Sequence, residues 1–507
     1  MAVTILDVLL PVFTLIVASL LTLIVFRVIR TRNRKTALAA AWVLVVSVIA
    51  MLTVANLAIN YYNVTNPQAL NLTLDGSNPA FSTSFLIDAV SIYMAIIIIT
   101  VATVVLLYTV FFINSVDRPS DRYIAIMFIL TAALIGAVLA GDLLTFFIFW
   151  EAATAGAAFL MLYRKNTSSL NATLKYLVMV IIASAFVLLG LSIIYGITGT
   201  LNYTAIRVAL AGITATNQNL LIIAFVFVAA GYAIEAAVVP FHFWLPDAYT
   251  AAPASSAAFL SALVDQGSYY ILIRILLFII LPPSHGGPLD WVPMLAALAA
   301  VAMIVGNIFA LIQNNVKRLI AYICVADVGY NLIAITSDTQ LGLAGNLYFF
   351  LIGGLTTAAA FMIVGIMNHY GYKTLEDFAG LGKKMPYASL ALVIVGLSFA
   401  GVPPLGGFIG KYLVFTSAIS SNLTWLAIIG VLTSVLQTAY IFRLVNIMYS
   451  KKPKDGITVR IKENTALLIP VFILVATIFI LGLFPEIALQ LIQPVMNQLP
   501  WGLVPVV

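Results

Sequence analysis

Several charged side chains lie inside long apolar stretches of this sequence, where their types and positions could carry an ion. They are Glu151, Glu235, Asp265, Asp327 and Lys411. An ionised side chain at the centre of a bilayer costs at least about 2.5–3.5 kcal/mol, so such a residue in a membrane segment is a functional candidate by default. Each of these groups can hold and release a proton, and a row of them can pass protons or bind small cations. The sequence therefore predicts an ion path.

The composition indicates the elements that position these residues. Of 507 residues, 63% are hydrophobic and only 8% are charged, whereas soluble domains carry about 25% charged residues. The apolar stretches are near or above the roughly 20 residues that cross a bilayer as a helix. We therefore expect an all-α polytopic membrane protein of about 14 transmembrane helices, beginning near Ile5, Ala37, Ser84, Tyr123, Leu143, Ala172, Leu220, Ala251, Trp291, Leu319, Leu341, Tyr387, Leu423 and Ala466.

Two of the expected helices are interrupted by proline: the seventh (220–249) and the twelfth (387–415). The first contains Pro240 and Pro246, and the second contains Pro403 and Pro404. Proline removes a backbone donor and breaks a helix. The two helices are five elements apart, so they should cross the membrane in opposite directions. Paired broken helices of this kind point to inverted repeats with an ion site near the middle of the membrane.

Three further aspartates lie near the ends of apolar stretches, where a structural role is the simpler interpretation. They are Asp88, Asp142 and Asp247. Carboxylates at such positions commonly cap a helix or pair locally with a cation.

The basic residues indicate the topology. Apart from Arg207, Arg274 and Lys411, every Lys and Arg falls within 27–35, 118–122, 164–175, 317–318, 373–384 or 443–462, which are alternate loops. The positive-inside rule then places these loops in the cytoplasm and both termini on the outer side of the cell membrane. The first span is followed by basic residues rather than a cleavage site, so we expect it to be retained.

Five motifs together carry a resemblance to a known family. They are GDLLTFFIFWE, VVPFHFWLPDAYTAAP, NNVKRLIAYICVADVGY, DFAGLGKKMP and FAGVPPLGGFIGK. In order and spacing they resemble the antiporter-like membrane subunits shared by complex I, the Mrp-type Na⁺/H⁺ antiporters and the energy-converting membrane-bound hydrogenase and sulfane reductase complexes. The resemblance implies a subunit that moves protons or sodium within a larger complex.

The resemblance also implies an internal organisation. No linker divides the chain, so 1–507 reads as a single integral membrane domain. Within it the family suggests three N-terminal helices (1–120), two inverted five-helix repeats (helices 4–8 in 121–280 and helices 9–13 in 290–450), and a fourteenth helix (460–507). The long amphipathic C-terminal helix of one class of these subunits is missing, so we expect a subunit other than the distal one.

Four residues match the family's pattern by position. Glu151 stands at the family's fifth-helix glutamate and Lys411 at the lysine of the broken twelfth helix. Lys175 and His242 stand where the family has similar residues. The resemblance therefore implies that these four residues take part in ion translocation.

Three acidic residues depart from the family's pattern. Glu235 and Asp265 stand where lysines are usual, and Asp327 stands where a histidine is frequent. If Glu151 and Glu235 face each other, as the family geometry implies, both cannot stay ionised cheaply. The pair would then share a proton or bind a cation, so a sodium site near these two carboxylates is the alternative to a proton relay.

Redox chemistry in this chain itself is not expected. With one cysteine and three histidines, a redox metal centre is hard to build. We expect no cofactor in this chain, and partner subunits that include other antiporter-like subunits. Transport is then coupled either to a peripheral redox module, whose subunits would carry iron–sulfur clusters or a nickel–iron centre, or to Na⁺/H⁺ exchange. No nucleic-acid partner is expected. Two alternatives stay open: a stand-alone secondary solute transporter, and a structural subunit with a degenerate channel.

Overall fold

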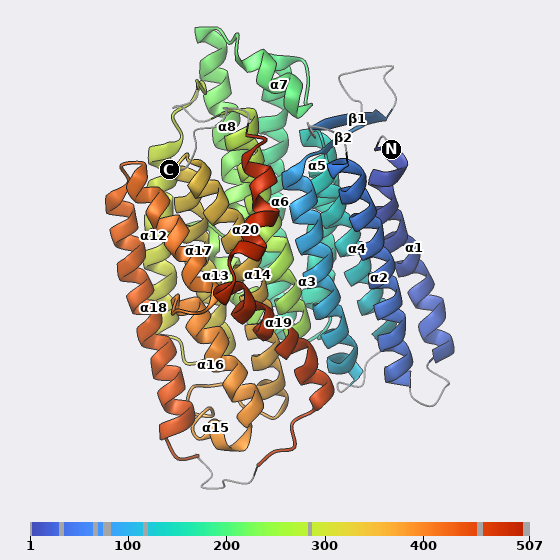
Figure 1. The fold of residues 1–507 in the computed structure, drawn as a ribbon, viewed down its shortest axis with the longest axis vertical. Helices are drawn as coiled ribbons and strands as arrows, with labels where there is room; N and C mark the ends of the chain where they lie inside the picture. The colour runs from blue at the N-terminus through green and yellow to red at the C-terminus, as the bar shows by residue number, and fades with distance from the viewer. Residues whose placement is uncertain are drawn as a thin grey trace.

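The computed structural model describes residues 3–29, 35–63, 69–74, 83–114, 120–281, 286–453 and 460–499, most of which form a bundle of long helices (Figure 1). The first half contains α1 (Ile5–Ile29), α2 (Lys35–Tyr62), α3 (Ala89–Asn114), α4 (Ser120–Leu139), α5 (Leu143–Leu162), α6 (Thr167–Thr198), α7 (Tyr203–Leu210), α8 (Ala215–Glu235), α9 (Trp244–Ala251), α10 (Ala254–Phe259) and α11 (Asp265–Ile273). The second half contains α12 (Val292–Leu311), α13 (Val316–Thr336), α14 (Gln340–His369), α15 (Leu381–Lys384), α16 (Pro386–Ala400), α17 (Gly406–Ser420), α18 (Thr424–Ser450), α19 (Thr465–Leu483) and α20 (Glu486–Met496).

The expected helical membrane fold is confirmed. In the described parts of the chain, 13 helical segments are long and apolar enough to cross a membrane. The expected twelfth span is the one that is not counted, because its first half, Pro386–Ala400, is too short on its own. A further helical piece, α17, continues it after a break. The difference from the expected fourteen spans is therefore the break itself.

The third span begins later than the sequence suggested. Residues near Ser84 form a strand, β2 (Thr83–Ile87), which pairs in antiparallel fashion with β1 (Leu70–Leu74), so the protein is not purely helical. Helix α3 begins only after Asp88, whose carboxylate accepts a hydrogen bond from the backbone N–H of Ser91 while the Ser91 hydroxyl accepts one from the N–H of Asp88. This reciprocal cap fixes the start of the helix.

Both helices that were expected to be interrupted near Pro240 and near Pro403 are broken. Helix α8 ends at Glu235, and a short 3₁₀ helix, η1 (Phe241–Phe243), leads from the break into α9. Helix α16 ends at Ala400, and Gly401 takes a left-handed conformation (φ 75°) before α17 begins. In Figure 1, α8 lies toward the end of the bundle that carries the N-terminus and the hairpin, whereas α16 lies toward the opposite end. The two broken helices therefore enter the bundle from opposite ends.

The centre of the bundle is formed by three segments that are almost completely buried: 254–279, α13 and α14. The first of these is not a uniform α-helix, because α10 and α11 flank a π-helical stretch, η2 (Leu260–Val264), and a second one, η3 (Arg274–Ile279), follows α11. π-Helical turns widen a helix and occur frequently at functional sites. Asp265 is the first residue after η2 and therefore lies at the junction between this irregularity and α11.

Candidate functional site

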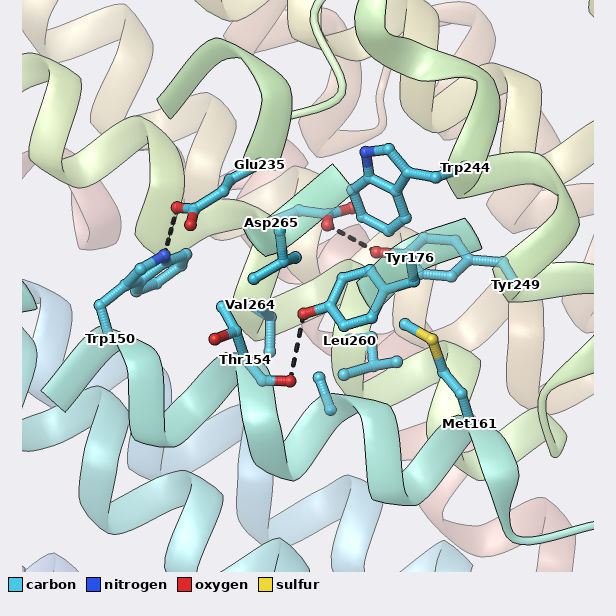
Figure 2. A pocket seen from close by; sticks show the side chains of 12 residues that line it. Trp150, Thr154, Met161, Tyr176, Glu235, Trp244, Tyr249, Leu260, Val264 and Asp265 are labelled. Atoms are coloured by element: carbon cyan, nitrogen blue, oxygen red, sulfur yellow. Dashed lines mark hydrogen bonds between the residues drawn. The ribbon is translucent and has the colours of Figure 1, made fainter. Parts of the chain in front are cut away.

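Asp265 lines a small cavity in the first half of the molecule (Figure 2). The cavity leaves about 10 Å³ for the centre of a water molecule, which is room for about one water. Its polar lining comes chiefly from Glu235 and Asp265, with Tyr176, Trp244 and Tyr249 around them. The Tyr249 hydroxyl donates a hydrogen bond of 2.5 Å to Oδ1 of Asp265. Helices α8 and α11 thus bring two carboxyl groups to the wall of one water-sized space, and α5, α6 and α9 supply side chains around them.

Glu235 is positioned by the break in α8 and by a tryptophan. It is the last residue of α8 and is 6% exposed. The indole N–H of Trp150 in α5 donates a hydrogen bond to Oε2 of Glu235 (Figure 2). A Cβ atom at Gly267 in α11 would lie 2.9 Å from Cη2 of the Trp150 ring and closer still to Cζ3. The absence of a side chain at Gly267 therefore makes room for the ring that holds Glu235.

Glu151 lies next to Trp150 in α5 but takes its hydrogen bond from another helix. The Ser184 hydroxyl in α6 donates a hydrogen bond of 2.6 Å to Oε1 of Glu151. The charges of Glu151 and Glu235 are close enough to interact, although each carboxyl group has its own donor. Glu151 is only partly buried. It therefore lies at the outer end of the row, and Glu235 lies further inside.

Asp265 also lines a second cavity, which opens toward the other half of the molecule. Its lining includes Asp265, Gln266, Cys324, Asp327 and Asn331, and it too leaves about 10 Å³ for the centre of a water molecule. Asp327 projects from α13 and is 8% exposed. One carboxyl group, that of Asp265, is thus shared by two water-sized cavities, and Glu235 lines one of them while Asp327 lines the other.

Lys411 ends the row in the second broken helix. Its ammonium group donates hydrogen bonds to the carbonyl of Phe399 (2.8 Å), the hydroxyl of Ser434 (3.1 Å) and Oε1 of Gln437 (2.6 Å). It also lies 4.4 Å from the centre of the Tyr330 ring, an arrangement that attracts a cation. Lys411 is 4% exposed, and its charge interacts with that of Asp327. The carbonyl of Phe399 comes from the last turn of α16, so the helix break supplies one of the ligands of this lysine.

Two of the expected residues lie apart from this row. Lys175 lies in the third turn of α6, where it forms an ion pair of 2.6 Å with Asp247 in α9, and its side chain is 61% exposed. His242 is buried in the break after Pro240, with its ring against Phe243 (4.4 Å between centroids). Neither residue belongs to the linings of the two cavities described above.

The short helix α9 is held by α13 as well as by Lys175. Arg318 forms an ion pair of 2.8 Å with Asp247. The ammonium group of the neighbouring Lys317, which is 3% exposed, donates to the carbonyl of Ala252 at the end of α9. A cation at a helix C-terminus satisfies its free carbonyl groups and its dipole. Two consecutive residues thus fix the second half of the first broken helix to α13, and the structural interpretation of Asp247 is supported.

The structure adds a buried ion pair that the sequence did not reveal. The guanidinium group of Arg274 donates two hydrogen bonds to Asp88, and both side chains are almost fully buried. Its Nε donates to the hydroxyl of Tyr270 at 2.8 Å. Among the described residues, no group of three or more His, Cys, Asp or Glu side chains could hold a metal ion. Arg274 and Asp88 therefore form a structural pair that is separate from the row from Glu151 to Lys411.

The comparison with known proteins places this geometry in a family. The sequence profile described as "NADH:quinone oxidoreductase/Mrp antiporter, TM" matches residues 140–437. The chain belongs to this family. The matched region contains both broken helices and all five charged residues of the row. The matched region therefore includes the residues that line the two cavities, and Lys411.

Relatives from several organisms agree with this assignment. The chain is 33% identical to NADH-quinone oxidoreductase subunit N of Acidithiobacillus ferrooxidans over 396 residues, covering 77% of this chain and 81% of that protein. It is 32% identical to F420H2 dehydrogenase subunit N of Methanosarcina mazei over 435 residues, covering 82% of this chain and 85% of that protein. These homologues are subunits of multisubunit membrane enzymes.

Solved structures show the same fold. A chain of the membrane-bound sulfane sulfur reductase, an archaeal respiratory membrane complex, superimposes with a TM-score of 0.86, with 26% identity and 97% of each chain covered. Chains of the Mrp complex from Dietzia sp. DQ12-45-1b (TM-score 0.83, 22% identity, 98% of each chain) and of respiratory complex I from Thermus thermophilus (TM-score 0.73, 24% identity, 95% of this chain and 98% of that one) share the fold. The expected family and its membrane location are therefore confirmed.

Proposed function

We propose that this protein is an ion-translocating subunit of a multisubunit membrane complex, and that it moves protons along the row Glu151, Glu235, Asp265, Asp327 and Lys411. The observation that carries this proposal is the position of Asp265 on both cavities. A carboxyl group between two water-sized spaces can receive a proton from one side and release it to the other. Glu235 and Asp327 are then the neighbouring donors and acceptors, and Lys411 ends the path through its interaction with Asp327.

Protons fit the first cavity better than sodium does. One oxygen of Glu235 accepts the indole N–H of Trp150, and an N–H donor directed at a carboxylate occupies a lone pair that a cation would need. A hard cation such as Na⁺ also prefers several oxygen ligands in one place, whereas these carboxyl groups are spread along a row. A sodium site between Glu151 and Glu235 is the second candidate, because the charges of these two carboxyl groups interact.

The same proposal includes the arrangement in the membrane. The basic loops lie in the cytoplasm, both termini lie on the outer side of the cell membrane, and the chain is one integral domain in which 121–280 and 290–450 are inverted repeats. The opposite approach of α8 and α16 supports the inverted repeats (Figure 1). Any cofactor of the complex, such as iron–sulfur clusters or a nickel–iron centre, is carried by partner subunits, and this chain contributes no redox step.

The test is the substitution Asp265→Asn in the complete complex. Proton uptake is measured with a pH-sensitive dye in everted membrane vesicles, driven by the electron donor of the parent complex or by an imposed Na⁺ gradient. We expect a loss of at least about 100-fold, the scale of a positioned proton-transfer group, whereas Asp265→Glu retains transport. Asp290→Asn is the matched control, because Asp290 is exposed and lies outside the row. Wild-type transport in Asp265→Asn would favour a structural subunit with a degenerate channel.

The ion and the complex need two further measurements. The sodium site would be favoured if the Glu235→Gln variant lost ²²Na⁺ uptake together with proton movement. Intact mass spectrometry of the complex, purified gently through a tag on this chain, identifies the partners. Redox subunits would make this chain part of a redox-driven pump, and small membrane subunits alone would make it part of a cation antiporter. Purification without partners would favour a stand-alone solute transporter.

A further inference from the structure

A groove lies at the end of the bundle that carries α15, well away from the ion path. Its volume is about 650 Å³, and it runs between the segment 460–465 and the start of α16 and α19. Its lining combines basic, aromatic and apolar side chains, among them Tyr387, Arg460, Lys462, Glu463, Ile469 and Phe472. The groove belongs to neither the cavities nor the lysine site.

The groove carries a net positive charge at its rim. The one carboxylate in it, Glu463, is already engaged, because its two oxygens accept the backbone N–H groups of Tyr387 (3.0 Å) and Ala388 (2.8 Å) at the start of α16. Arg460 and Lys462 are exposed. Neither of them takes part in the ion pairs found among the described residues, which involve Asp88 and Asp247. Two cations are thus available to an anionic ligand.

The depth of the groove matches the boundary between lipid headgroups and acyl chains. Lys462 and Glu463 immediately precede α19, a membrane span that begins at Thr465. Ile469, which is 56% exposed, and Phe472 follow within the first two turns of that span. The guanidinium group of Arg460 stacks over the Tyr387 ring at 5.3 Å from its centre. Charged groups therefore lie at the level of a headgroup, and apolar groups lie below them at the level of its chains.

We propose that this groove binds an anionic phospholipid, with the phosphate between Arg460 and Lys462 and an acyl chain along Ile469 and Phe472. Charge complementarity selects an anionic headgroup, since basic residues beside a membrane span attract acidic lipids. The apolar wall selects a lipid over a free phosphate ion, which would leave Ile469 and Phe472 uncovered. The site is a feature beyond the proposed ion transport and does not depend on it.

The site is connected to the ion path by a single helix. Glu463 holds the first turn of α16, while the carbonyl of Phe399 in its last turn accepts a hydrogen bond from Lys411. A lipid that fixes the segment around Glu463 would therefore also fix the helix that carries a ligand of Lys411. The structure joins a headgroup site at one end of α16 to the lysine at the other.

The experiment measures lipid bound to the complete purified complex. Delipidated complex is titrated with phosphatidylglycerol or with phosphatidylcholine, and bound lipid is counted by native mass spectrometry. The double variant Arg460→Gln and Lys462→Gln should bind phosphatidylglycerol about 30-fold more weakly, the effect of two headgroup cations. The matched control is Lys451→Gln and Lys452→Gln, which removes the same charge from exposed positions of the same loop. It should bind as the wild type does.

Two results would overturn the proposal. One is equal weakening in both double variants, or none in either, because the groove would then have no special role. The other comes from a photoreactive amino acid placed at Ile469 in the assembled complex in native membranes. A phospholipid adduct is expected, whereas an adduct with another subunit would show that protein, and not lipid, fills the groove.

Discussion

The contact between Gly267 and Trp150 gives the sharpest test of how Glu235 is positioned. A Cβ at position 267 would meet Cη2 of the Trp150 ring at 2.9 Å, where ordinary contacts lie at 3.4–4 Å. The substitution Gly267→Ala must therefore push the ring away by at least about 0.5 Å, and by more at Cζ3. Because alanine is favoured over glycine in a helix interior by about 1 kcal/mol, a loss of function could not be blamed on a weaker helix.

The expected size of the effect follows from the hydrogen bond that the displaced indole makes. A hydrogen bond to a charged group contributes about 1.5–3 kcal/mol, which corresponds to roughly 10–150-fold in rate. We expect Gly267→Ala to lower proton transport within this range while the complex still assembles. Trp150→Phe should have a similar effect, because it removes the donor and keeps an aromatic ring.

The assay is the vesicle measurement of proton uptake, applied to single and double variants. Phenylalanine lacks the outer ring atoms that meet position 267, so adding Gly267→Ala to Trp150→Phe should cost little more. Gly196→Ala in α6 is the control, because no atom lies within 4 Å of the Cβ it would add. Wild-type transport in Gly267→Ala, or effects that simply multiply in the double variant, would refute the view that Gly267 acts through Trp150.

Three further predictions concern charged groups. Asp88→Asn should lower the stability of the complex by about 3–5 kcal/mol, since it leaves Arg274 buried without its anion. In a thermal inactivation assay, adding Arg274→Met to this variant should recover part of the loss. Lys411→Gln should leave the amount of assembled complex in the membrane unchanged but lower proton uptake by at least about 100-fold; normal uptake would remove this lysine from the path. Asp247→Asn should change stability by no more than about 1 kcal/mol, because its ion pairs are partly exposed, and a larger shift in the melting temperature would mean that α9 depends on them.

The sequence was sufficient for features that depend on local chemistry. The apolar runs predicted the spans, and the prolines predicted both helix breaks because proline acts on its own backbone. The third span was placed too early because Ser84 lies in an apolar run that pairs as a strand, and only the cap at Asp88 shows where the helix begins.

The contacts between distant segments could not be predicted from the sequence. Trp150 precedes Glu151 directly, yet it bonds to Glu235, 85 positions away. The sharing of Asp265 between two cavities depends on how α9, α13 and the π-helical stretch pack, and no spacing rule encodes that packing. The role of Lys175 is likewise set by the side chain that lies opposite it, Asp247. A tryptophan beside a membrane glutamate was the one available signal for the indole contact.

The attachment of α9 to α13 has a mechanical consequence. Lys317 and Arg318, in the first turn of α13, bind α9 through a hydrogen bond and an ion pair. Asp327 lies ten positions after Lys317 in the same helix, which is about 15 Å at the rise of an α-helix. A helix of this length behaves as a stiff rod. A displacement of α9 at the break beside Glu235 would therefore be transmitted to the first turn of α13. It would tilt α13 and shift the carboxyl group of Asp327. The two halves of the protein would then be mechanically coupled through Lys317 and Arg318.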